Sequence, residues 1–278
     1  MRVRSLVLLA LLSATVSVTA QQAAAPAAPP KRVNPAIARL ETGGIVDGEV
    51  LSFIDMEHNP YIIQEVRERA DAAAARRKPD GMLEKAPVVR IPMYGFEPPA
   101  WAALQVLDLG ALGVVFQSIE TKAQAERAIG AMRFPSQKGS GLPTYPKGYR
   151  SGAPRGGKTL AMSADELLKR ADVWPLNPAG ELMAILMIET ADGVKNLDQI
   201  LAVPGISSIL VGSYDLSLSL GVGPPKNGAN PYAPETEAAI ATIAKACARH
   251  KVVCGIAAGG GAEYRKKLID MGYRLFLN

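Results

Sequence analysis

Blocks of apolar residues alternate along this chain with stretches in which apolar positions recur every three or four residues. The first pattern is typical of buried strands and the second of helices with one apolar face. Strands are expected at 51–55, 87–91, 112–116, 182–188, 206–211, 252–257 and 273–277, with a weaker candidate at 44–46. Helices are expected at 62–77, 101–109, 122–132, 164–171, 193–201, 235–250 and 262–271.

This alternation predicts a parallel sheet with crossover helices, and seven or eight strands favour a TIM (β/α)8 barrel over 34–278. An open doubly wound sheet is the alternative, but no GxGxxG follows an early strand, which disfavours its dinucleotide-binding version. Few residues separate position 34 from the first firm strand, and the printed chain ends directly after the last strand. We therefore expect a barrel that is incomplete at its first βα unit and its last helix.

The first thirty residues have the pattern of a processing signal. Arg2 and Arg4 precede the apolar run 6–18, and Val18-Thr19-Ala20 fits the small-residue rule for cleavage. Residues 1–20 are therefore predicted to be a signal peptide and 21–33 an Ala/Pro-rich spacer. The apolar run is too short for a comfortable membrane span, so we expect export to the periplasm or medium without stable membrane insertion.

Composition narrows the class of protein further. The chain has 278 residues, 48% of them hydrophobic and 21% charged, which suits a packed globular protein. The formal charge of +5 includes two leader arginines, and no basic run is interleaved with aromatic residues, so nucleic acid is not an expected partner. Two cysteines exclude a disulfide scaffold. Cys247 and Cys254 are either two buried thiols or a pair, because an exported protein meets an oxidising compartment.

Polar side chains gather where the predicted strands end. In a barrel, the carboxyl ends of the strands meet on one face, and that face carries the chemistry. The residues in question are Asp55, Glu57, His58, Arg90, Gln117, Glu120, Glu189, Gly212, Ser213 and Asp215.

Two of these acids suggest a metal. Glu189 and Asp215 follow adjacent strands, and two carboxylates with waters and substrate oxygens are a common site for Mg²⁺ or Mn²⁺. The alternative is that each acid caps the helix after it. Ile119-Glu120-Thr121 repeats the pattern around Glu189, so the residues alone do not decide between the two glutamates.

His58 and Arg90 suggest acid–base chemistry and anion binding. Asp55 lies three residues before His58, and a carboxylate that orients an imidazole is a common general-base arrangement. The alternative for His58 is an inert position on a surface loop. Arg90 needs an anionic partner at the end of a buried strand, either in a structural salt bridge or from a substrate carboxylate.

Residues 152–159, GAPRGGKT, satisfy the P-loop pattern, but their context is wrong. Loop-like residues precede the motif where a P-loop needs a strand, and the next helix is expected near 163. Nucleotide binding is therefore not predicted.

Several motifs in order resemble the HpcH/HpaI aldolase family of metal-dependent class II pyruvate aldolases. They are FIDMEHNP at 53–60, PVVRIP at 87–92, LDLGALGVVFQSIET at 107–121 and MIETADGVKNLDQILAVPGISSILVGSYDLSLSLG at 187–221. The resemblance covers roughly 51–278. It implies a TIM-type barrel that reversibly cleaves a carbon–carbon bond of a 4-hydroxy-2-oxo acid through a pyruvate enolate.

The resemblance also implies roles for particular residues. Glu189 and Asp215 would hold the divalent metal, Mg²⁺, Mn²⁺ or Co²⁺. Asp55 and His58 would form the base dyad, and Arg90 would hold the enolate and carboxylate. The remaining implied substrate-binding residues are Gly212, Ser213 and Tyr214, which would cradle the carboxylate, and Asp108, which would reach a neighbouring subunit of a homo-oligomer.

Two departures from the family pattern are visible, because Met187 stands where many members have Gln and Ser213 where Pro is usual. The expected partners are a small 2-oxo acid and an aldehyde. Two alternatives stay open: a citrate-lyase-type enzyme acting on acyl-CoA esters, and a non-catalytic relic of the barrel. His58 favours the aldolase over the acyl-CoA lyase.

Overall fold

The computed structural model describes residues 31–92, 100–228, 231–257 and 260–277. Its centre is one parallel sheet in the order β1-β2-β3-β5-β6-β7-β8, with β4 paired to β5. The strands are β1 Leu51–Asp55, β2 Ala86–Arg90, β3 Gly113–Phe116, β4 Val173–Trp174, β5 Leu182–Ile188, β6 Ser208–Gly212, β7 Val253–Ala257 and β8 Tyr273–Phe276. All seven firmly predicted strands are confirmed, to within two residues at either end.

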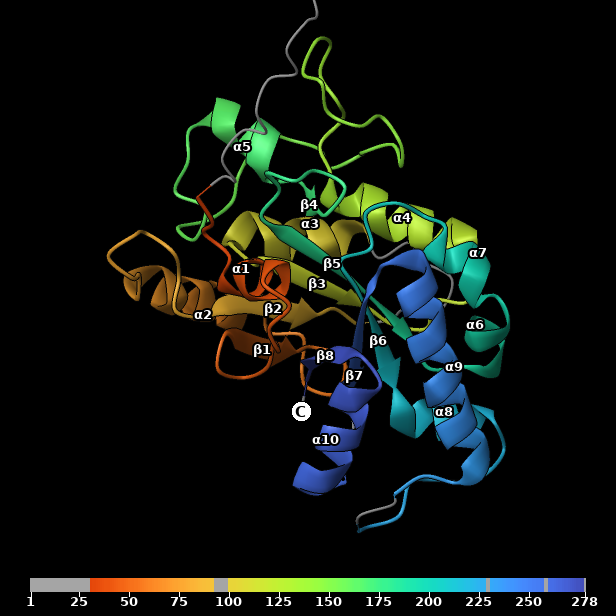
Figure 1. Cartoon of the computed structure of the whole chain (residues 1–278). Helices are drawn as coiled ribbons and strands as arrows, with labels where there is room; N and C mark the ends of the chain where they lie inside the picture. The colour runs from red at the N-terminus through yellow and green to blue at the C-terminus, as the bar shows by residue number, and fades with distance from the viewer. Residues whose placement is uncertain (1–30, 93–99, 229–230, 258–259, 278) are drawn as a thin grey trace, which may run out of the picture.

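Helices connect the strands and pack around the curled sheet (Figure 1). They are α1 Pro35–Glu41, α2 Ile63–Ala75, α3 Ala100–Leu109, α4 Lys122–Met132, α5 Ala164–Arg170, α6 Ala191–Lys195, α7 Leu197–Leu201, α8 Ser213–Ser219, α9 Pro234–His250 and α10 Gly261–Asp270. The predicted helix 193–201 is wrong in one respect, because Asn196 ends α6 and begins α7. The sequence did not predict α1, α8 or the short strand β4.

The strand β5 illustrates why the sheet is buried on both faces. All seven of its residues are buried, and its run LMAILMI contains no polar side chain. Such uninterrupted apolar strands are typical of parallel sheets covered by helices. Because the strands are parallel, their carboxyl ends all meet at one edge of the sheet.

The barrel is incomplete at a seam between β8 and β1, as the sequence predicts. Among the described residues, no ladder joins these two strands, and the weak strand candidate at 44–46 contributes a single bridge from Val46 to Leu275. An ion pair of 2.6 Å between Arg265 on α10 and Asp47 fastens the same seam, and Arg265 also lies 4.1 Å above the ring of Phe276.

The N-terminal edge of the sheet is tied together by a buried carboxylate. Glu181, 0% exposed, stands directly before β5 and accepts hydrogen bonds from the backbone N–H groups of Val33 (3.1 Å) and Asn34 (2.9 Å). Arg170 donates to its other oxygen at 2.5 Å, and Arg32 lies 3.9 Å from that oxygen. This network holds α1 against the starts of the central strands.

Two further predictions concern the cysteines and the N-terminal leader. Cys247 on α9 and Cys254 on β7 are both buried and free, and the pKa of the Cys254 thiol is raised chiefly by burial and then by the neighbouring Cys247 thiol. The predicted signal peptide and most of the spacer lie outside the described residues. Within the described part, no helix is long and apolar enough to cross a membrane.

Candidate active site

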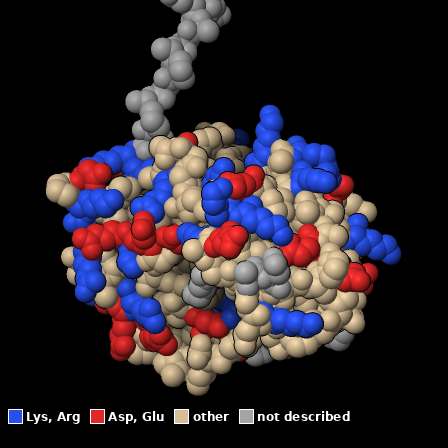
Figure 2. Space-filling view, turned by 60° about the horizontal axis from the view of Figure 1, so that its bottom comes forward, with Lys and Arg blue, Asp and Glu red and all other residues tan. Residues whose placement is uncertain are grey.

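The polar residues that follow the predicted strands do meet at the carboxyl-terminal edge of the sheet. Asp55 and Arg90 are the last residues of β1 and β2 and are register partners. Glu189 directly follows β5, and Gly212 ends β6 before the first turn of α8. Figure 2 shows the face brought forward from the lower side of Figure 1, where acidic and basic side chains lie interspersed around a hollow.

Arg90 is the hub of the first cluster. Its Nε donates to Asp55 Oδ1 at 2.9 Å, and its Nη2 donates to Asp55 Oδ2, so the pair is bidentate. Its Nη1 lies 3.0 Å from Glu57 Oε2. Its Nη2 also lies 2.7 Å from His58 Nδ1, and because a guanidinium can only donate, this ring nitrogen accepts.

These contacts set the charge state of Asp55. Burial alone would raise its pKa, but hydrogen bonds from Arg90 and from the backbone N–H of Glu57, together with the charge of Arg90, hold the pKa below its ordinary value of 3.8. Burial lowers the pKa of Arg90, but the hydrogen bond and charge of Asp55 and the charges of Glu57 and Glu189 raise it above its ordinary value. Both groups are therefore charged at neutral pH, and Asp55 is bound to Arg90 more closely than to His58.

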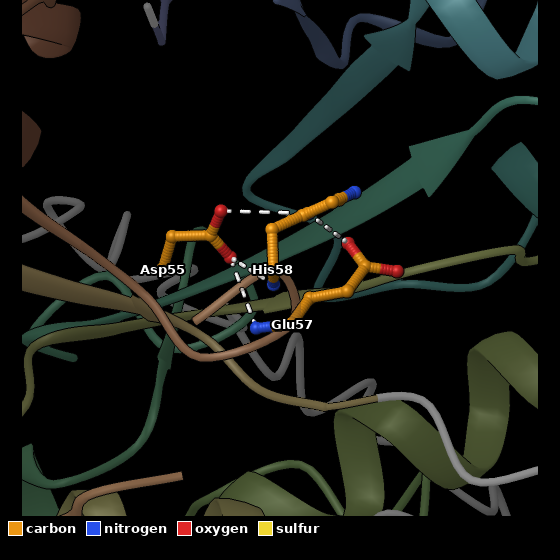
Figure 3. Close-up of side chains that lie close together, drawn as sticks. All are labelled: Asp55, Glu57 and His58. Atoms are coloured by element: carbon orange, nitrogen blue, oxygen red, sulfur yellow. Dashed lines mark hydrogen bonds and ion pairs between the residues drawn. The ribbon is translucent and has the colours of Figure 1, made fainter. Parts of the chain in front are cut away.

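His58 is the exposed member of the cluster. Its side chain is 62% exposed, and its Nδ1 lies 3.5 Å from both Asp55 Oδ2 and Glu57 Oε2. Figure 3 shows the imidazole between the two carboxyl groups. The ligand atoms of these three residues lie within 4.8 Å of one another, a spacing that suits a metal ion. Arg90 already brings a positive charge to the same place, which disfavours a second cation there.

Glu189 occupies a different environment. It is 5% exposed, and its Oε1 accepts hydrogen bonds from the backbone N–H (2.8 Å) and hydroxyl (2.6 Å) of Ser118. Burial raises its pKa, the bonds from Ser118 offset part of this rise, and the charges of Glu57 and Asp215 raise it further. The charges of Glu57 and Asp215 thus both act on Glu189, which is the electrostatic condition for binding a cation.

The structure makes neither acid the N-cap of the helix after it, although Asp215 stands in the first turn of α8, where an acid interacts favourably with the helix dipole. Thr190, not Glu189, is the N-cap of α6, where it accepts from the N–H of Gly193 at 3.1 Å. The N-cap of α8 is Gly212, and no side chain caps this helix end. Among the described residues, neither Glu189 nor Asp215 forms an ion pair with a basic side chain. Both carboxylates are therefore available to another ligand.

Gly212 keeps the space beside Glu189 open. A Cβ atom at this position would lie 2.5 Å from Glu189 Oε2 and 2.6 Å from Met187 Cε. Ser213, which follows, is buried, and its hydroxyl contacts Tyr232 Oη (2.7 Å) and donates to the carbonyl of Ala257 (2.5 Å). Tyr214 is largely exposed and lines the cavity described below. The backbone of this turn thus faces the site while the Ser213 side chain faces β7.

Asp108 lies away from this group within the chain. It stands near the end of α3, where Arg150 Nη2 lies 2.7 Å and Arg155 Nη1 3.9 Å from its carboxylate. In the P-loop-like segment, Lys158 pairs with Asp71 at 2.7 Å and the buried Thr159 donates to the carbonyl of Gly110. No helix begins at Lys158, so the segment lacks the P-loop context.

Ser118 is the residue that sequence reasoning missed. Its φ of 48° is unusual for a residue other than glycine, and this conformation directs both its N–H and its hydroxyl at Glu189. The contact joins residues 71 apart in sequence, so no local pattern could reveal it. The only signal was its position two residues after β3.

Comparisons with known proteins agree with this geometry. Residues 49–260 match the sequence model of the family described as HpcH/HpaI aldolase/citrate lyase. A hydroxypyruvate/pyruvate aldolase of Paraburkholderia phytofirmans is 32% identical over 222 residues, covering 80% of this chain and 74% of that protein. A 4-hydroxy-4-methyl-2-oxoglutarate aldolase of Hapsidospora irregularis is 29% identical over 233 residues, covering 81% and 71%. A crystal structure of an HpcH/HpaI aldolase/citrate lyase family protein from Burkholderia cenocepacia superposes with a TM-score of 0.65 at 29% identity, covering 84% and 87%.

Proposed function

The chain belongs to the HpcH/HpaI aldolase/citrate lyase family, and from this premise we propose that it is a metal-dependent lyase that splits a 4-hydroxy-2-oxo acid into pyruvate and an aldehyde. The observation that carries the proposal is the buried Glu189, whose carboxylate faces the charges of Asp215 and Glu57 at the same edge as Arg90. A site with this arrangement suits a cation on one side and an anionic substrate oxygen on the other.

The donor set fits a divalent cation. Carboxylate oxygens are the preferred ligands of Mg²⁺ and Mn²⁺, and among the described residues no basic side chain forms an ion pair with Glu189 or Asp215. We assign the ion, Mg²⁺, Mn²⁺ or Co²⁺, to these two residues rather than to the group of Asp55, Glu57 and His58. When bound there, it would act as a Lewis acid on the 2-oxo and carboxylate oxygens of the substrate.

Arg90, the first turn of α8 and His58 would carry out the rest of the reaction. Arg90 supplies positive charge where the enolate oxygen develops, a role in which a fixed cation stabilises the transition state. The N-terminal turn of α8, from Gly212 to Tyr214, presents backbone N–H groups without a side-chain cap and would hold the substrate carboxylate. His58 takes the proton of the C4 hydroxyl, which lets the C3–C4 bond break.

Arg90 and His58 are coupled in this proposal. In the structure, His58 Nδ1 accepts from Arg90, so this nitrogen is not free to take a proton. A substrate oxygen that binds Arg90 competes with this contact and releases Nδ1. The base would therefore become available only when a substrate is in place.

Two further expectations remain proposals. Asp108 is proposed to reach the site of a neighbouring subunit in a homo-oligomer, which requires that its pairing with Arg150 leaves one carboxylate oxygen accessible. The leader at residues 1–20 is proposed to direct export. An exported location would mean that the substrate is a compound present outside the cytoplasm.

Pyruvate release tests the function directly. Purified protein is incubated with 4-hydroxy-2-oxo acids and, in parallel, with malyl-CoA, and pyruvate or acyl-CoA products are measured. We expect pyruvate from the free acids only, loss of activity in EDTA, and recovery with Mg²⁺, Mn²⁺ or Co²⁺. A covalent pyruvate adduct trapped by borohydride would contradict the metal mechanism. A cooperatively folded protein that releases no product from any substrate would instead support the non-catalytic relic.

A further inference from the structure

A cavity of about 850 Å³ extends from the candidate active site. Asp55 and Arg90 line it at one end, and residues of α10 and the end of β8 line it at the other. Cavities of roughly 300–1,000 Å³ typically enclose ligands of drug size. The cavity is therefore far larger than pyruvate and a small aldehyde need.

Part of the cavity wall is apolar. Its side chains are Leu210, Leu268, Phe276 and Leu277, each at most 4% exposed. Arg265 also lies on this wall, but its guanidinium is paired with Asp47 and stacked on Phe276, so its charge is already compensated. Water against such a wall finds few polar partners, and an apolar group gains about 25 cal/mol for each Å² it covers.

The incomplete barrel accounts for the extent of this space. In a closed barrel, a further strand would stand between β8 and β1, whereas here Val46 makes only a single bridge. The cavity includes Phe276 and Leu277 beside this seam and Phe53 of β1 on its other side. The seam thus adds apolar surface to a cavity that is also lined by Lys226 and Asn227, and the charge of Arg265 beside the seam is paired with Asp47.

We propose that this apolar wall is the acceptor subsite and that it selects a substrate whose C4 carries a bulky apolar group of aromatic-ring size. This inference rests on the proposed function. In the cleavage, the C4 hydroxyl proton passes to the base, the C3–C4 bond breaks, and C4 leaves as the carbonyl carbon of an aromatic aldehyde. The electron pair of the broken bond stays on C3, which is then protonated to give pyruvate.

Two substrates that differ only at C4 test the proposal. The full-length protein, supplied with Mg²⁺, is assayed for pyruvate release from 4-hydroxy-2-oxopentanoate and from 4-hydroxy-2-oxo-4-phenylbutanoate. We expect kcat/KM to be at least about tenfold higher for the phenyl substrate, because even one methylene in an apolar pocket changes selectivity by about tenfold or more. Equal values, or a preference for the methyl substrate, would overturn the inference and leave the proposed function intact.

A pair of variants on α10 locates the selectivity. Ala262 is exposed in the first turn of α10 and lines the cavity, whereas its neighbour Glu263 is also exposed but does not line it. Ala262→Phe should reduce the phenyl-to-methyl ratio of kcat/KM at least about fivefold by filling the chamber. Glu263→Phe should leave the ratio unchanged. An unchanged ratio in Ala262→Phe would place the selectivity elsewhere and contradict the assignment of this wall.

Binding without turnover separates the inference from the lyase proposal. 2-Oxo-4-phenylbutanoate and 2-oxobutanoate lack the C4 hydroxyl, so neither can be cleaved. If the phenyl compound binds at least about tenfold more tightly while no hydroxy acid is cleaved, the apolar subsite stands and the lyase proposal fails. If the two analogues bind equally, the subsite assignment fails.

Discussion

Glu181 and Glu189 flank β5 at its two ends, and both carboxylates are buried. Glu181 accepts from two backbone N–H groups and from Arg170, with Arg32 beside it. Glu189 receives only the two bonds from Ser118 and faces the charges of Glu57 and Asp215. At the N-terminal end of the strand, Arg170 neutralises the buried charge in direct contact. At the carboxyl-terminal end, no basic side chain among the described residues forms an ion pair with Glu189, and the charge of Arg90 acts on it without that contact. The difference separates an edge that holds the fold together from an edge arranged to bind ligands.

The largest expected effect is on the activity of the carboxyl-terminal end. Glu189→Gln keeps the size and the hydrogen bonds to Ser118 but removes the charge that would bind the metal. We expect kcat to fall about 10³-fold, the upper part of the range for losing one electrostatic group at a reacting oxygen. The melting temperature should stay the same or rise, because the variant relieves repulsion from Glu57 and Asp215. A strongly destabilised Glu189→Gln protein would mean that the two ends do not differ as described.

The matched change at the other end should affect stability instead. Glu181→Gln leaves Arg170 without its anion, whereas Arg32 keeps its ion pair with Glu41. Breaking a buried ion pair from one side costs about 3 kcal/mol at the lower end of the usual range. For a chain of this size, each kcal/mol lowers the melting temperature by about 2–4 °C. Calorimetry measures this loss, while kcat/KM below the transition should change less than twofold. A large activity loss in folded Glu181→Gln protein would contradict the assignment of a purely structural role to the N-terminal end of β5.

The third effect concerns the two histidines. His58→Ala should lower kcat about 10²-fold, because a positioned general base contributes 10²–10⁴ and this one is largely exposed. Metal affinity, measured by titration calorimetry, should remain. His250→Ala is the matched control, because His250 pairs with Asp198 at 2.9 Å on the end of α9 and touches no residue of the site. Equal rates for His58→Ala and His250→Ala would show that His58 is an inert residue on a surface loop.

The smallest effect is the pH dependence contributed by Asp55. Its pKa is held below 3.8 in the folded protein, so the folded state binds fewer protons than the unfolded state just below that value. The stability from Asp55 is therefore present above pH 3.8 and is lost as the pH falls through the lowered pKa. Asp55→Asn should destabilise the protein by at most about 1 kcal/mol at pH 7, because the pair is partly exposed. Urea unfolding between pH 3 and 7 should show the two proteins converging at low pH.

The sequence predicted elements best where burial alone determines them. The run LMAILMI of β5 gave its exact bounds, because only a strand covered on both faces is apolar at every position. The sequence did not predict α8, because residues Ser213–Ser219 alternate polar and apolar side chains over a length too short to show a helical period. It also missed the break at Asn196, where one predicted helix is two short ones.

The sequence placed the site residues at the carboxyl-terminal edge of the sheet, but it did not predict which side chains contact one another. Asp55 was expected to orient His58, and the structure shows it bound chiefly to Arg90, 35 residues away. The approach of Ser118 to Glu189 and of Glu57 to Arg90 likewise depends on neighbouring strands. Side chains on different strands come together only in the assembled sheet, so the pattern of residues along the chain does not predict these pairs.

The seam has a consequence for the order in which this protein folds. The ion pair between Arg265 and Asp47 joins residues 218 apart, so the contact cannot form during synthesis until α10 has left the ribosome. The loop-closure entropy of such a contact grows with the logarithm of the separation, and in the part of the chain that the structure describes one bridge and one ion pair offset it. We therefore expect the sheet from β1 to β7 to assemble first and the seam last. In the folded protein, we expect the backbone amides at the seam to exchange first with solvent. We also expect limited proteolysis to cut the chain first at the seam.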